Sequence, residues 1–159
     1  MNAREIVYYG QKHVEDVFRD LPDDAWSVVG VTSRWTLRDL LAHLVSFELL
    51  LEDSLTVVAG ERSAPAYYPV ERGFATFNDD EVAARAQASP AELMRDLAET
   101  HARVLARIET LGAERLAQAG TVPWYGAGYS LDDMIVYANY GHKREHCAQV
   151  KTFRARIGK

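Results

Sequence analysis

The sequence predicts an all-α protein: a four-helix bundle with long connecting loops and a minor helix. Four helix-start signals, each followed by apolar side chains at helical spacing, support this fold class. Alternating strand patterns are scarce, and Gly30 interrupts the short apolar run at 28–31. With 159 residues, of which 48% are hydrophobic, we expect a single domain over residues 1–159.

Each helix-start signal pairs a Ser, Thr or Asn with an acidic residue three positions later. Such a pair caps the free N–H groups of the first turn and suits the positive end of the helix dipole. The four pairs are Asn2 with Glu5, Thr36 with Asp39, Ser89 with Glu92, and Ser130 with Asp133. We therefore expect long helices to begin at these four places.

The apolar stripe behind each start repeats every three or four residues. We expect the first helix to end before Pro22, the second at Gly60 and the third at Gly112, and the fourth to run almost to the C-terminus. The stripes contain Val7, Val14, Val17 and Phe18; Leu37, Leu40, Leu41, Leu44, Phe47, Leu51, Leu55 and Val58; Leu93, Leu97, Val104 and Ile108; and Leu131, Ile135, Val150 and Phe153.

Two long loops are rich in aromatic residues, one over 61–77 and one over 121–129. Between the first loop and the third helix, Asn78 is expected to cap a minor helix that continues to about Ala88. Long ordered loops in compact domains are often functional. The simpler interpretation, preferred for most of these aromatic residues, is that they close the ends of the bundle.

Charge and composition exclude several classes of function. Lys+Arg 18 against Asp+Glu 23 gives a net charge of −5 without a basic stripe, so we expect no nucleic-acid partner. The first residues resemble no signal peptide, and the apolar runs are too short to cross a membrane. Cys147 is the single cysteine, which excludes an internal disulfide and a multi-cysteine zinc site. We expect a cytoplasmic protein in which Cys147 is a buried thiol.

Two histidines of the fourth helix have the spacing of a metal-binding pair. His142 and His146 are i and i+4 neighbours, so their imidazoles can converge on one ion. Ile135 lies seven residues before His142, and Phe153 lies seven after His146, so both histidines face the core. Lys143 is expected on the opposite side of the helix.

A third histidine, His43, faces inward from the second helix between Leu40 and Phe47. Two ligands from one helix and one from a neighbour make a three-histidine site with an open position, as catalytic zinc sites have; imidazole ligands also suit nickel. His101 lies on the stripe of the third helix and is an alternative third ligand, although we expect it to be a core or supporting residue. His13 is expected to be structural.

These residues resemble the DinB-like superfamily. The resemblance rests on residues 35–44 (WTLRDLLAHL) and 142–150 (HKREHCAQV), and it extends to Phe77-Asn78 and to the segment around Trp124. It implies a four-helix bundle that binds a divalent metal through one histidine of helix two and two of helix four, here His43, His142 and His146. The family includes mycothiol-dependent maleylpyruvate isomerase and bacillithiol transferases, so the resemblance also admits a low-molecular-weight thiol as cofactor.

The leading hypothesis is therefore a metal-dependent enzyme of the thiol S-transferase or hydrolase type that acts on a small molecule. The ion would lower the pKa of a water or thiol at the open position. Glu145 is a candidate to orient a ligand histidine, with a solvated surface carboxylate as the equal alternative. Tyr137, Tyr140 and Trp124 are candidates to line a pocket, with core packing as the default.

Three other interpretations compete. Residues 142–146 also read H-x-x-E-H, the inverted zinc-peptidase motif, but none of the 13 residues after His146 is the acidic ligand that this class needs, so we expect no peptidase. A non-catalytic metal-binding or small-molecule-binding protein of the stress-response type is the second class. A homodimer that buries exposed apolar surface against a second copy is the third.

Overall fold

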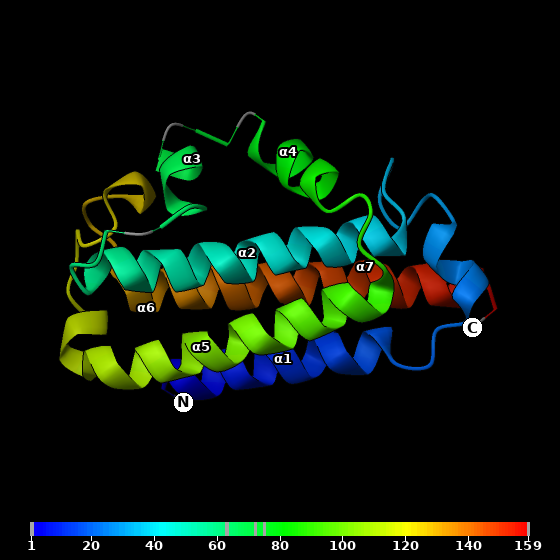
Figure 1. Ribbon diagram of the computed structural model, residues 1–159. Coiled ribbons are helices and arrows are strands. Elements are labelled where there is room, and N and C mark those ends of the chain that lie inside the picture. The colour runs from blue at the N-terminus through cyan, green and yellow to red at the C-terminus, as the bar shows by residue number, and fades with distance from the viewer. Residues whose placement is uncertain (1, 63, 72, 75, 159) are drawn as a thin grey trace.

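The computed structural model describes residues 2–62, 64–71, 73–74 and 76–158. Residues 1 and 159 of the predicted domain, and three positions of the first long loop, lie outside this description. Four long helices lie side by side, which confirms the all-α bundle (Figure 1). They are α1 (Ala3–Phe18), α2 (Leu37–Val58), α5 (Pro90–Leu116) and a fourth built from α6 (Leu131–Met134), η3 (Ile135–Gly141) and α7 (His142–Arg156).

All four predicted helix starts are confirmed. In each, the side chain of the cap residue accepts from the backbone N–H three residues later, and the acidic side chain accepts from the cap residue's own N–H. The predicted helix end at Gly112 is also present: its φ of 73° and ψ of 163° are non-helical, so α5 consists of two helical segments that meet at Gly112, and the second ends at Leu116.

The chain runs in one direction through α1 and the fourth helix and in the opposite direction through α2 and α5 (Figure 1). Since α2 and α5 run parallel, the chain must return along the bundle between them. It does so through α3 (Tyr67–Glu71) and α4 (Phe77–Ala84), which lie against α2 on the outside of the bundle.

This crossover corrects two predictions about the loops. The segment 61–77 contains a short helix, α3, because the buried carboxylate of Asp53 accepts hydrogen bonds from the backbone N–H groups of Ala66 and Tyr67 at its start. The minor helix α4 begins one residue before Asn78, with Thr76 as its N-cap, and ends at Ala84.

The apolar core consists of two clusters, one towards each end of the bundle. One cluster contains Leu37, Leu40, Leu41, Leu93, Leu97, Val150 and Phe153, and the other contains Leu50, Leu51, Leu55, Val104, Ile108, Leu131 and Ile135. Between them, every long helix contributes a buried polar residue, including Gln11, Glu48, His101 and Lys143. We call this middle level of the bundle the polar layer.

Other short elements complete the bundle ends. η1 (Asp23–Ser27) packs against the start of α2, and η2 (Pro123–Tyr125) contacts α3. Within the described part of the chain, strand-like pairing is limited to an isolated bridge between Val29 and Thr36. No described helix is both long enough and apolar enough to cross a membrane.

Candidate metal centre

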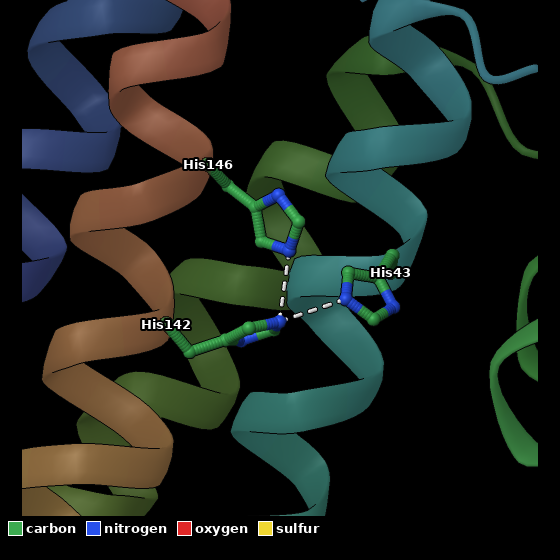
Figure 2. A group of neighbouring side chains, drawn as sticks. All are labelled: His43, His142 and His146. Atoms are coloured by element: carbon green, nitrogen blue, oxygen red, sulfur yellow. Dashed lines mark hydrogen bonds between the residues drawn. The ribbon is translucent and has the colours of Figure 1, made fainter. Parts of the chain in front are cut away.

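Three histidine side chains meet in the polar layer. His43 projects from α2, and His142 and His146 project from α7, so that their Nε2 atoms point toward one another (Figure 2). The His142 Nε2 atom lies 2.9 Å from that of His43 and 2.8 Å from that of His146. The structure thus brings together the three histidines that the sequence singled out.

The spacing of these nitrogens suits a small divalent ion. A tetrahedral ion with Zn–N bonds of about 2.0–2.1 Å holds its ligand atoms about 3.3 Å apart. The observed separations of 2.8 and 2.9 Å are within about half an ångström of that value. These two separations need to change by only about half an ångström, and all three ligand atoms lie within 4.8 Å of one another.

Burial keeps the imidazoles uncharged. His43 is 2% exposed and His146 is 8% exposed, whereas His142 is half-buried. Burial, together with repulsion from His146 when that ring is protonated, lowers the pKa of His43 to about 3. Burial and the same neighbour lower the pKa of His142 to about 2. Neutral imidazoles are the form that binds metal ions.

The outer nitrogens of the three rings have different surroundings. His146 Nδ1 donates to Gln149 Oε1 at 2.8 Å, which leaves the Nε2 lone pair of a neutral His146 directed at the other two rings. The Nδ1 atoms of His43 and His142 are buried without a hydrogen-bond partner among the described residues. Glu145, the carboxylate considered for orienting a histidine, is exposed; the oxygen that hydrogen-bonds His146 belongs to Gln149.

Aromatic rings surround His43. The ring centroid of Trp35 lies 4.8 Å from that of His43, and the ring centroid of Phe47 lies 4.7 Å from it. Phe47 also packs against His142, with centroids 4.2 Å apart. These contacts hold the rings in place and keep the site apolar.

The backbone changes just before the histidine pair. Residues Ile135–Gly141 form a π-helical segment, and α7 begins at His142 without a break in helical backbone angles. A Cβ at Gly141 would lie 3.3 Å from the carbonyl oxygen of Val136, so glycine relieves crowding in this wider turn. Because the segment ends at Gly141, its turn sets the direction in which His142 projects.

A second polar cluster lies in the same layer, centred on Glu48. Its carboxylate is fully buried and accepts from Lys143 Nζ at 2.7 Å, Asn139 Nδ2 at 3.0 Å and His101 Nδ1 at 3.0 Å. Burial alone would raise the pKa of Glu48, but the Lys143 charge and these hydrogen bonds outweigh it and lower the pKa to about 2. We call these four residues the Glu48 cluster.

Lys143 corrects a sequence prediction. It was expected on the outer side of the helix, but its side chain is 2% exposed. The carboxylate of Glu48, 2.7 Å from the lysine Nζ, balances the charge and permits this burial. Gly10 of α1 lies beside the lysine stem, but a Cβ there would meet Lys143 Cδ at an ordinary contact distance of 3.5 Å and would be closer, at 3.2 Å, to Tyr140 Cδ2.

Sequence reasoning also missed Glu48, although a signal exists. Glu48 lies four residues after Leu44 and three before Leu51, inside the apolar stripe of α2, so an inward-facing carboxylate is readable there. Gln149 follows His146 by three residues, within reach on the same helix.

The remaining histidines and the cysteine lie outside the three-histidine cluster. His101 belongs to the Glu48 cluster, as a supporting residue of the core, and His13 is half-buried, with its Nε2 3.0 Å from Lys151 Nζ. Cys147 is fully buried, and burial raises the pKa of its thiol to about 11. A thiol of that kind is a poor nucleophile near neutral pH.

The candidate pocket residues have three different placements. Tyr137 is 66% exposed on the outside of the bundle. Tyr140 packs near Gly10 of α1. Trp124 lines a cavity of about 250 Å³ that also includes Phe47 and Phe74. Because Phe47 contacts two of the three histidines, this cavity adjoins the cluster.

Comparison with known proteins agrees with this architecture. The family model described as DinB superfamily matches residues 8–150 of the chain, which is most of its length. None of the curated proteins or solved structures compared with the chain gives a significant match. The chain belongs to the DinB superfamily.

Proposed function

We propose that this member of the DinB superfamily is a divalent-metal-dependent enzyme whose ion, zinc or nickel, is held by His43, His142 and His146. The observation that carries the proposal is the meeting of three histidine side chains, two buried and one half-buried, with His142 Nε2 within 2.9 Å of the other two Nε2 atoms. The proposed reaction is thiol S-transfer or hydrolysis of a small molecule.

The chemistry of the donor set supports a metal ion. The inward nitrogens lie at hydrogen-bond distance, but His142 Nε2 carries either one proton or one lone pair, so it makes a full hydrogen bond to only one of its two neighbours. A divalent ion satisfies all three nitrogens at once. His146 is already held in the required tautomer by Gln149 Oε1.

The chain's own residues would orient the site and keep bulk water from it. When bound, an ion with three protein ligands acidifies a water or thiol at its open position, which makes a nucleophile available near neutral pH. Trp35 and Phe47 both pack against the His43 ring, and Phe47 also packs against His142. The adjoining cavity supplies a place for a small substrate.

Metal uptake is the first test. Wild-type protein, stripped with a chelator and dialysed against zinc or nickel, is expected to retain about one ion per chain by elemental analysis. His43→Ala and His142→Ala are expected to lose this ion. His101→Ala is the matched control: a buried histidine of the same layer that lies outside the cluster, and it should keep the ion. Retention by His43→Ala with loss in His101→Ala contradicts the ligand assignment.

Catalysis needs a separate test. Loaded protein is screened against electrophiles with several low-molecular-weight thiols and against ester and amide hydrolase substrates, with and without chelator. Chelator-sensitive turnover that disappears in His142→Ala supports the enzyme. A fully loaded protein that is inert toward both substrate classes contradicts it and favours a binding protein.

A further inference from the structure

The cavity beside the three histidines is walled almost entirely by uncharged side chains. Its volume is about 250 Å³, and none of the described residues that line it carries a charge. The wall toward the crossover is aromatic: the rings of Phe47 and Phe74 are nearly parallel, at 18°, and Trp124 meets Phe74 edge-on. Flat apolar walls favour a flat ligand.

Two polar atoms at this cavity lack partners. Trp124 Nε1 and Asn139 Oδ1 are both buried, and neither has a hydrogen-bond partner among the described residues. Both residues line the cavity, and Asn139 is 2% exposed. A buried donor or acceptor without a partner carries a free-energy penalty. A ligand that satisfies both atoms would recover this energy.

The orientation of Asn139 follows from the Glu48 cluster. The Glu48 carboxylate can only accept hydrogen bonds while it is ionised, and it pairs with the ammonium of Lys143. The amide of Asn139 must therefore turn its NH2 group toward Glu48, at 3.0 Å, which directs its carbonyl oxygen elsewhere. The Glu48 cluster thus presents Asn139 as an acceptor.

We propose that this cavity binds a small, flat, uncharged organic molecule that carries both a hydrogen-bond acceptor, for Trp124, and a donor, for Asn139. An aromatic carboxamide is the simplest molecule of this class. A carboxylate of the same size suits the site poorly, because it would bring a second negative charge to an uncharged cavity near Glu48. Binding of this molecule to the cavity is independent of the function proposed above. Its role as a substrate of the metal centre rests on that function.

Benzamide and benzoate are the matched probes. Their binding to the wild-type chain is measured by ligand-observed NMR and titration calorimetry, before and after zinc loading. Benzamide is expected to bind at least about tenfold more tightly than benzoate. Equal or tighter binding of benzoate, or no detectable binding of benzamide, overturns the proposal.

Two variants locate the binding. Trp124→Phe keeps an aromatic ring and removes the donor, so it should weaken benzamide binding about fivefold or more. Trp26→Phe is the control, since Trp26 stacks on Phe18 at the other end of the bundle, and it should leave binding unchanged. Equal effects of the two variants contradict this location.

A third variant guards against misfolding of Trp124→Phe. Phe74 is partly exposed at the edge of the cavity, so Phe74→Ala enlarges the space with little cost to the core. It should improve the binding of 1-naphthamide relative to benzamide. No change in this ratio counts against the cavity.

The metal centre and the cavity can fail separately. If benzamide binds but zinc is not retained, the proposed function fails and the cavity stands; the reverse result removes the cavity alone. The link between them is tested with benzohydroxamate, which adds a metal-binding group to the same ring. It should bind zinc-loaded protein at least about tenfold more tightly than zinc-free protein or zinc-treated His43→Ala. Equal binding overturns the link.

Discussion

The polar layer contains two buried clusters that differ in how their polar atoms are satisfied. In the Glu48 cluster, one carboxylate meets an ammonium, an amide and an imidazole from three other elements, all within 3.0 Å. In the histidine cluster, three imidazoles meet only one another at their inner nitrogens, and two outer nitrogens have no partner in the described chain. The first cluster balances its charges within the chain, although Asn139 Oδ1 has no partner among the described residues, whereas the inner nitrogens of the second need a group from outside.

This contrast separates structural from functional burial of polar groups. A buried charge that the chain balances holds helices in register, and removing its partner lowers the free energy of unfolding. A buried set of donor atoms without protein partners instead favours the binding of a group from outside.

Removing one partner of the Glu48 cluster should be the most damaging change. Lys143→Met leaves a fully buried carboxylate without its counter-ion, so the free energy of unfolding should fall by about 3–5 kcal/mol, as measured by urea denaturation. Glu48→Gln combined with Lys143→Met removes both charges and should recover at least half of that loss. No recovery in the double variant would argue against charge balance as the cause.

Zinc should stabilise the protein only through the histidine cluster. With free zinc at about 100 to 1,000 times the dissociation constant, the free energy of unfolding should rise by about 3–4 kcal/mol. His142→Ala should show no zinc-dependent change. A calorimetric melt with and without chelator checks both, and similar stabilisation of the variant would place the ion elsewhere.

As the pH falls, the metal-free protein should lose stability through His43 before the Glu48 carboxylate is protonated. Because the pKa of His43 is lowered from 6.5 to about 3, the unfolded chain takes up a proton at a higher pH than the folded chain does. Stability is therefore full above pH 6.5 and falls as the pH decreases toward 3, by up to about 1.4 kcal/mol per unit for this histidine.

The Glu48 carboxylate affects the free energy of unfolding at a lower pH. Its pKa is lowered from 4.5 to about 2, so its contribution is complete above 4.5 and is lost only below that value. Urea denaturation between about pH 7 and 5 thus reports on the histidines. His43→Phe should flatten the slope in that range; an unchanged slope would assign it to other groups.

The smallest loss of stability is expected for a change at Glu52, one turn along α2 from Glu48. Glu52 pairs with Arg103 at 2.8 Å, but the arginine is 51% exposed, so solvent screens the pair. Glu52→Gln should cost less than about 1 kcal/mol in urea denaturation. A loss as large as that of Lys143→Met would show that burial does not separate the two carboxylates.

Local signals in the sequence predicted most of the fold. All four capping boxes form because each joins residues only three positions apart, and the apolar stripes require only helical periodicity. The loops were predicted less well. α3 forms because Asp53 reaches Ala66 across 13 positions, a contact that periodicity does not indicate.

The sequence by itself determined the bundle and selected the three histidines, because inward-facing positions follow from helical spacing within each helix. Only the tertiary structure decided which polar residues share the interior with them. Lys143 is buried because a carboxylate 95 positions away receives it, and Asn139 is turned by the same carboxylate 91 positions away. Burial of a charge depends on its partner, and partners this distant are set only when the helices pack.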